Sequence, residues 1–220
     1  MLRGIDALVF DFDGLLMDTE STLLECWRAE WRRHGLRLDE TGFFADHGGD
    51  VTEQRYAELA AAVGPGFDRA TSHARRVAHR DALHAGLGLA PGIRDWLDRA
   101  GALGLRLAVA SSSPRSWVEH HLARTGDLDR FAVRAYGDEV AGHKPDPAVY
   151  LLALRRLGVA PDRAVAFEDT PHGVAAAKAA GLRCVAIPNR YADQSRFAAA
   201  DLLLRAAADL PLAEVLSALA

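Results

Sequence analysis

The sequence predicts an α/β protein with a doubly wound parallel-sheet core and an inserted all-helical subdomain. Short apolar runs alternate with helical patterns along most of the chain, the runs show no polar alternation, and the pattern stops over one long stretch near the N-terminus. Continuous apolar runs are typical of strands buried on both faces of a parallel sheet. A chain of 220 residues is long for one compact domain and short for two, which favours a core with an insertion.

Five apolar runs rich in Val, Leu and Ala are predicted to be strands, and helical patterns separate them. Three of these patterns have Pro near the start and Gly at the end, and another is a short Ala-rich helix. Strand alternating with helix favours right-handed crossovers and a Rossmann-like sheet. The predicted strands are residues 7–10, 105–110, 164–167, 184–187 and 201–204, and the predicted helices are residues 91–104, 114–126, 146–158 and 171–181.

The stretch from residue 18 to residue 88 contains no strand-like run and is expected to form the helical subdomain. Gly-rich breaks, HGGD and VGPG, separate its helical patterns. The core would then comprise residues 1–17 and 89–220. The predicted helices of the subdomain are residues 19–34, 39–46, 52–63 and 68–85.

The composition, 50% hydrophobic and 25% charged, is that of a soluble globular protein. A net charge of −4 gives no indication of a nucleic-acid or anionic-membrane partner. No apolar run approaches the roughly 20 residues that span a bilayer, and the N-terminus lacks the pattern of a signal peptide. Cys26 and Cys184 lie far apart without metal-ligand spacing, so we expect both to be reduced and the protein to be cytoplasmic.

Chemically reactive side chains follow the predicted strands, at the edge of the sheet where open α/β folds bind ligands. The side chains are Asp11 and Asp13 after the first strand, Ser111 after the second, Lys144 in the loop HKPDP, and Glu168 and Asp169 after the third.

The types of these residues favour phosphoryl transfer. In an extended Asp-x-Asp segment both side chains project to the same side. With the acidic pair at residues 168–169, about four negative charges would share one crevice, which requires a cation. Hard oxygen ligands suit Mg²⁺, whose open positions phosphate oxygens can fill. Ser111 can hydrogen-bond those oxygens, Lys144 adds a compact positive charge, and one carboxylate remains as nucleophile.

Each motif has an ordinary structural explanation when it is taken alone. DFDG is a common turn after a strand, SSSP is a helix N-cap, KPDP is a loop, and FEDT is a capping arrangement. Their order and their shared edge of the sheet make the set specific. Lys144 adds support, because the chain has 26 basic residues and only Lys144 and Lys178 are lysines. A chain that otherwise chooses arginine uses a lysine where a small point charge suits a phosphate.

These motifs resemble those of the haloacid dehalogenase superfamily, and the likeness covers nearly the whole chain. DFDGLLMDTE resembles its first motif, ASSS its second, HKPDPAVY its third and FEDTPHGVAAAKAAGLRCVAIPN its fourth. The helical insert is similar to the cap of the branch that contains β-phosphoglucomutase and many small-metabolite phosphatases.

The resemblance implies a role for each motif residue. Asp11 would be the nucleophile that forms an aspartyl-phosphate, and Asp13 would be the general acid for the leaving alcohol and then the base for water. The remaining implied roles are Mg²⁺ binding by Asp11, the Asp13 carbonyl and Asp169, with Glu168 supporting the metal directly or through water, and binding of phosphoryl oxygens by Ser111 and Lys144.

Departures from related patterns narrow the expected reaction. A dehalogenase would lack the second aspartate, and a phosphonoacetaldehyde hydrolase needs a cap lysine that residues 18–88 do not contain. A sugar-phosphate mutase carries a His where Leu23 stands and a basic residue near the first Gly-rich loop of the cap. Here no Lys or Arg follows HGGD until Arg55. Simple hydrolysis remains.

We therefore expect a Mg²⁺-dependent phosphoric monoester hydrolase that acts on a small phosphorylated metabolite, with a sugar phosphate as the leading substrate class. Its cap would close over the crevice and select the leaving group, with His47, Asp50 and Arg55 as candidate specificity residues. We expect a monomer or weak homodimer. A phosphomutase and a catalytically idle binding or regulatory module on the same fold are the alternatives.

Overall fold

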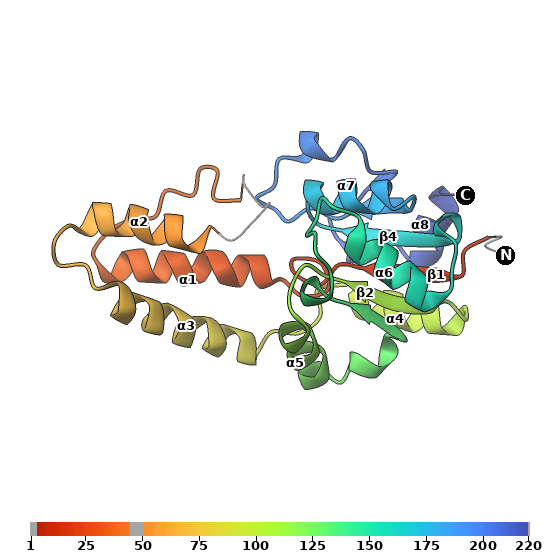
Figure 1. The fold of residues 1–220 in the computed structure, drawn as a ribbon, viewed down its shortest axis with the longest axis horizontal. Coiled ribbons are helices and arrows are strands. Elements are labelled where there is room, and N and C mark those ends of the chain that lie inside the picture. The colour runs from red at the N-terminus through yellow and green to blue at the C-terminus, as the bar shows by residue number, and fades with distance from the viewer. Residues whose placement is uncertain (1–3, 45–50, 220) are drawn as a thin grey trace. The chain divides into compact units, whose positions relative to one another are not determined.

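The computed structural model describes residues 4–44 and 51–219 and separates into two units (Figure 1). One unit, here the sheet unit, comprises residues Met1–Met17 and Gly88–Ala220, and the other, the helical unit, comprises Asp18–Leu87. The sequence placed the second boundary one residue later, at 88/89. Each unit is described by itself below.

A six-stranded parallel sheet with the order β3-β2-β1-β4-β5-β6 forms the centre of the sheet unit. Five strands match the predicted runs to within two residues at either end. The sixth, β3, was not predicted, because its three residues include Arg134 and give no apolar run. The strands are β1 (Ala7–Phe10), β2 (Arg106–Ala110), β3 (Val133–Ala135), β4 (Ala164–Glu168), β5 (Arg183–Ala186) and β6 (Leu202–Leu203).

Helices cover both faces of the sheet, as the doubly wound prediction requires. Alternate strand residues such as Val9 and Ala166 form one apolar cluster with α6 and α7. On the other face Trp96 of α4 contacts Phe167, with ring centroids 5.1 Å apart. The helices of this unit are α4 (Ile93–Ala102), α5 (Arg115–Thr125), α6 (Ala148–Leu157), α7 (Pro171–Ala179) and α8 (Leu212–Ala218), of which α8 was not predicted.

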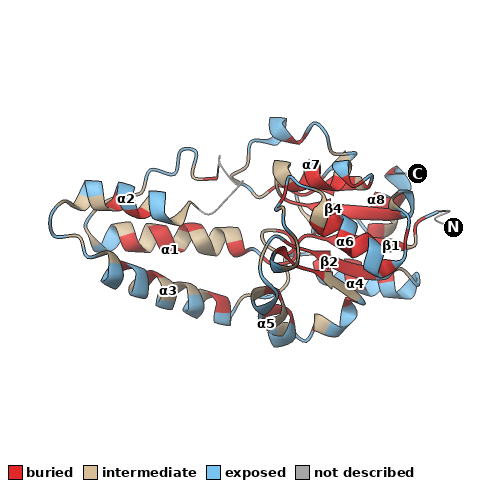
Figure 2. Cartoon of the chain, in the orientation of Figure 1, coloured by how far each residue is buried: buried red, intermediate tan, exposed pale blue. Residues whose placement is uncertain are grey.

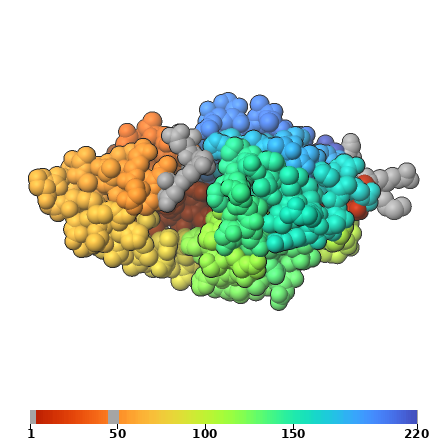
Figure 3. All heavy atoms as spheres, in the orientation of Figure 1, coloured from red at the N-terminus to blue at the C-terminus, as the bar shows by residue number. Residues whose placement is uncertain are grey.

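Burial increases toward the two central strands. Every residue of β1 and β4 is buried (Figure 2). Phe10 stacks on Phe167 with ring centroids 4.7 Å apart. Atoms from the middle of the chain, coloured green to cyan, form much of the surface of the sheet unit on the face shown in Figure 3. Short 3₁₀ turns complete the unit: η1 (Leu128–Arg130), η2 (Gly137–Glu139), η3 (Pro161–Arg163), η4 (Gln194–Phe197) and η5 (Ala207–Asp209).

The helical unit consists of α1 (Thr19–Arg33), α2 (Thr52–Val63) and α3 (Arg69–Ala85). A small apolar cluster of Trp27, Tyr56 and Leu59 joins α1 to α2. None of the helices in the described parts of the chain is long and apolar enough to cross a membrane.

The helix predicted at residues 39–46 is wrong over its described part: residues 39–40 have no regular structure and residues 41–44 form a turn. Two local features oppose a helix there. The Asp39 side chain accepts a hydrogen bond from the Thr41 backbone N–H at 2.9 Å, which competes with helical bonding. Gly42 adopts a positive φ of 71°, a conformation that a right-handed helix does not contain.

A buried carboxylate ties α1 to α3. Glu30 is 1% exposed, and its Oε1 accepts hydrogen bonds from Ser72 and Arg75, both at 2.7 Å. Glu25 lies on the same helix but is more exposed, and its ion pair with Arg32 is near the surface.

We predict that Glu30→Ala lowers the free energy of unfolding by about 1–3 kcal/mol, because it leaves the buried Ser72 hydroxyl without its acceptor and removes the partner of the partly exposed Arg75. The matched variant Glu25→Ala should cost less than about 1 kcal/mol, since exposed ion pairs contribute little. Urea denaturation of the whole chain, followed by circular dichroism, measures both. Equal losses would show that burial of Glu30 adds nothing to this contact.

Candidate active site

The register of the two central strands brings two acidic residues together. Phe10 of β1 pairs with Phe167 of β4, so the chain leaves the two strands side by side as Asp11 and Glu168. The Asp11 backbone N–H donates to the Phe167 carbonyl at 3.0 Å, which extends the hydrogen-bond ladder to Asp11. Asp169 follows directly. One carboxylate oxygen from each of Asp11, Glu168 and Asp169 can lie within 4.8 Å of the others, and all three residues are buried.

A buried lysine lies among these acids. The Nζ of Lys144 donates to Asp11 Oδ1, to Glu168 Oε1 at 2.6 Å and to the Ala110 carbonyl at 2.9 Å. The Tyr150 hydroxyl donates to the same Glu168 oxygen at 2.6 Å. Lys144 therefore links the ends of β1, β2 and β4. The other lysine, Lys178, bonds both oxygens of Asp201 at 2.7–2.8 Å and takes no part in this cluster.

Burial and the charges of the cluster shift the pKa values of Asp11 and Lys144. Burial raises the pKa of the Asp11 carboxyl to about 8, against the opposing effect of the Lys144 ammonium, and the negative charge of Glu168 adds to the rise. Burial works to lower the pKa of Lys144, but the charges of Asp11 and Glu168 outweigh it and raise this pKa, so the ammonium stays protonated at neutral pH.

The donor set of the acidic cluster fits a divalent cation. Among the described residues three carboxylates face the Lys144 ammonium, so the cluster carries a net negative charge when its acids are ionised. Oxygen ligands that converge within 4.8 Å are those that hard cations take. A cation there would also lower the pKa of Asp11 and favour its ionised carboxylate.

Asp13 lies on the turn that follows β1, and two neutral donors hold it. The Trp117 indole Nε1–H donates to Oδ1 at 2.9 Å, and the Ser113 hydroxyl donates to Oδ2 at 2.5 Å. Both donors come from the segment after β2. The sequence prediction used Ser111 of this segment but missed Ser113 and Trp117, whose only signal was their position after a strand end.

Ser111 is buried at the end of β2, next to β1 in the sheet. Its Oγ accepts a hydrogen bond from the Ser113 backbone N–H at 3.0 Å, and its own backbone N–H donates to the Ala135 carbonyl at 3.1 Å. These bonds fix the loop that the sequence assigned to phosphate binding.

A glycine of α7 makes room for Glu168. Thr170 caps the helix by accepting a hydrogen bond from the Gly173 backbone N–H at 3.1 Å. A Cβ on Gly173 would lie 1.9 Å from Glu168 Oε2, so only glycine leaves space for this carboxylate. Sequence reasoning did not identify Gly173, nor Tyr150, because each supports the site through the folded geometry.

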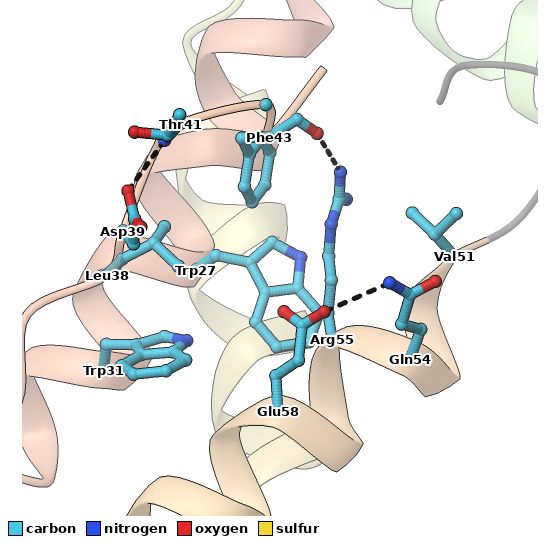
Figure 4. Close-up of a pocket in the computed structure, with 11 residues that line it drawn as sticks. Trp27, Trp31, Leu38, Asp39, Thr41, Phe43, Val51, Gln54, Arg55 and Glu58 are labelled. Carbon is cyan, nitrogen blue, oxygen red and sulfur yellow. Dashed lines mark hydrogen bonds between the residues drawn. The ribbon is translucent and has the colours of Figure 1, made fainter. Parts of the chain in front are cut away.

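The specificity residues expected in the helical unit have different outcomes. His47 and Asp50 lie outside the described residues. Arg55 is described: its Nη2 donates to the Phe43 carbonyl at 2.7 Å, and its guanidinium stacks 3.7 Å from the centre of the Phe43 ring. Together with Trp27 and Trp31 it lines a pocket of about 220 Å³ within the helical unit (Figure 4).

Comparisons with known proteins agree with the motifs. The model of the haloacid dehalogenase-like hydrolase family matches residues 8–187. Among curated proteins, YhcW of Bacillus subtilis, a candidate phosphatase, is 35% identical and the match covers 96% of each chain. The phosphorylated carbohydrates phosphatase of Thermotoga maritima is 35% identical over 81% of this chain and 82% of that protein.

A solved structure extends the likeness to the fold. The crystal structure of a candidate β-phosphoglucomutase from Thermotoga maritima has a TM-score of 0.81 and 29% identity, and the match covers 96% of this chain and 98% of that chain. With its parallel sheet, its helical insertion and these relatives, the chain belongs to the haloacid dehalogenase-like hydrolase family, in the β-phosphoglucomutase-like branch, and is a phosphoric monoester hydrolase.

Proposed function

We propose that the protein is a Mg²⁺-dependent phosphatase that hydrolyses a small sugar phosphate through an aspartyl-phosphate intermediate. The convergence of Asp11, Lys144, Glu168 and Asp169 at the ends of β1 and β4 is the observation that carries this proposal. The substrate class is supported by the Thermotoga relative, which is named for phosphorylated carbohydrates. The two buried, free cysteines Cys26 and Cys184 support a reducing, cytoplasmic location.

Asp11 and Asp13 share the reaction between them in this proposal. An Asp11 carboxylate oxygen attacks phosphorus, the bond from phosphorus to the ester oxygen breaks, and Asp13 gives its proton to the departing alcohol. Water then attacks the phosphorus of the aspartyl-phosphate, Asp13 takes the proton from that water, and phosphate and the Asp11 carboxylate are released.

The other site residues bind and neutralise charge. The protonated ammonium of Lys144 and the hydroxyl of Ser111 both donate hydrogen bonds to phosphoryl oxygens. A Mg²⁺ ion held by Asp11, Asp169 and the Asp13 carbonyl, with support from Glu168, would supply charge neutralisation for the phosphate. We further propose that the helical unit acts as the cap and that His47, Asp50 and Arg55 select the leaving group.

Leu23 supports hydrolysis over the mutase alternative. In the helical unit Leu23 packs against the apolar cluster of Trp27, Tyr56 and Leu59. The position where a mutase would carry its histidine is therefore filled by an apolar side chain that contacts this cluster. In addition, no Lys or Arg follows HGGD until Arg55, so the sequence lacks the basic residue expected near the first Gly-rich loop of a mutase cap.

A panel of phosphorylated metabolites, assayed for phosphate release, tests the proposed activity. We expect release from sugar phosphates, and a loss of about 10³-fold or more in Asp11→Asn, because a covalent nucleophile is removed with little change of shape. Asp162→Asn, at an exposed carboxyl of η3, is the matched control and should keep wild-type turnover. Full activity of Asp11→Asn would show that another group attacks phosphorus.

Metal binding has a readout that does not depend on activity. Mg²⁺ should raise the Tm of the wild-type protein, because a ligand that binds only the native state stabilises it by about 2.7 kcal/mol at 100 times its Kd. Asp169→Asn should reduce this shift strongly, whereas Asp162→Asn should preserve it. A Tm that ignores Mg²⁺ in the wild-type protein would contradict the metal assignment.

Incubation with β-glucose 1-phosphate and a trace of the bisphosphate separates hydrolase from mutase. We expect inorganic phosphate, or no reaction if this sugar is a poor substrate, and no glucose 6-phosphate. Efficient isomerisation without phosphate release would instead identify a mutase.

A further inference from the structure

The carboxylate of Asp13 is held at both oxygens by side chains about 100 residues away in the sequence. Trp117, on the first turns of α5, bonds Oδ1 at 2.9 Å, and Ser113, in the loop before α5, bonds Oδ2 at 2.5 Å. Neither contact is needed to build the sheet or to cap α5. Two side chains therefore converge on one carboxylate at a candidate active site.

The two donors differ in whether they can also accept a hydrogen bond. An indole N–H is a donor only, so the oxygen that faces Trp117 must remain an acceptor whether or not Asp13 carries a proton. A serine hydroxyl is both donor and acceptor and can rotate. The Oδ2 of Asp13 can therefore gain or lose a proton without breaking its contact to Ser113, whereas Oδ1 cannot become a donor toward Trp117.

Further contacts keep both donors in place. The Trp117 ring packs on His121 with ring centroids 4.3 Å apart, and the Trp117 carbonyl lies 2.9 Å from His121 Nδ1. The Ser113 carbonyl accepts a hydrogen bond from the Gly137 backbone N–H at 3.0 Å, and its own N–H bonds Ser111 Oγ. The arrangement is thus fixed on a helix and on a bonded loop, as a site that orients a reacting group requires.

We propose that Trp117 is a positioning residue for proton transfer: it fixes Oδ1 of Asp13 as an acceptor and leaves Oδ2, shared with Ser113, as the oxygen through which the proton moves. This inference rests on the proposed role of Asp13. In the first half-reaction the proton on Oδ2 passes to the ester oxygen as the bond to phosphorus breaks. In the second, Oδ2 takes a proton from the attacking water, so the cycle closes without another reactant.

Removal of the indole N–H with retention of an aromatic ring tests the proposal. Trp117→Phe should lower kcat by about tenfold for a sugar phosphate, as expected for one lost hydrogen bond to a charged group. It should change kcat little for p-nitrophenyl phosphate, whose leaving group needs little protonation. A purely structural role would lower both rates equally.

Trp96→Phe is the matched control. The Trp96 indole, on α4 of the same unit, donates to the Leu210 carbonyl at 2.9 Å, so this variant also loses one indole hydrogen bond, away from Asp13. Its ratio of the two rates should equal that of the wild-type protein, even if its Tm falls. The same change of ratio in Trp96→Phe and Trp117→Phe would overturn the proposal.

A double-mutant cycle separates failure of this inference from failure of the proposed function. Asp13→Asn should lose more activity on the sugar phosphate than on p-nitrophenyl phosphate, and adding Trp117→Phe should have no further effect on that ratio. If Asp13→Asn itself shows no dependence on the leaving group, the acid role of Asp13 is wrong, and the inference falls with it. If Asp13→Asn shows the dependence and Trp117→Phe does not, only the inference is wrong.

Discussion

The rest of the site depends on one interaction, the pairing of the Lys144 ammonium with the carboxylates of Asp11 and Glu168. Three acids converge because β1 and β4 run parallel in register, and without a positive charge their repulsion would oppose burial. Lys144 reaches both carboxylates and the Ala110 carbonyl, so it also binds the end of β2 to the centre of the sheet. Arginine supplies most of the positive charge of this chain, but its wide planar fork differs from the compact ammonium that meets three oxygens here.

The two aspartates that follow β1, Asp11 and Asp13, have different surroundings. Asp11 is buried against charged groups, and its pKa responds to burial and to Lys144 and Glu168. Asp13, two residues on, lies among neutral donors, Trp117 and Ser113. Residues two apart in an extended segment share a face, but the turn after β1 separates their partners. The proposed roles, nucleophile for Asp11 and proton carrier for Asp13, call for such different environments.

The parts of the fold that the sequence predicted are those with a strong local signal. The central strands, buried on both faces, read as unbroken apolar runs, and Pro and Gly mark the ends of α4, α5 and α6. Strand β3 escaped prediction because an edge strand of three residues with Arg134 has no such run. The helix expected at residues 39–46 does not form because the Asp39 side chain accepts a hydrogen bond from the Thr41 backbone N–H and Gly42 adopts a positive φ.

The site residues also divide into those with a local sequence signal, which could be predicted, and those without one. Residues directly after strands, such as Asp11 and Asp169, could be assigned because parallel strands end at one edge of the sheet. Tyr150 and Trp117 could not, because each lies on a helix and reaches the site only through tertiary packing. In the sequence, a tyrosine or tryptophan within a helical pattern gives no sign of a functional role. The role follows from the hydrogen-bond acceptor that each side chain reaches in the fold, Glu168 for Tyr150 and Asp13 for Trp117.

Gly173 has a consequence for anyone who wishes to make this protein more robust. Glycine in a helix interior costs about 1 kcal/mol relative to alanine, so replacing helix glycines by alanine is a common way to stabilise a protein. In α7 that replacement would push a methyl group into Glu168 and disturb the carboxylate that receives Lys144 and Tyr150. The first turn of α7 therefore keeps a residue of low helix propensity, because the Glu168 carboxylate occupies the space that a side chain at Gly173 would need.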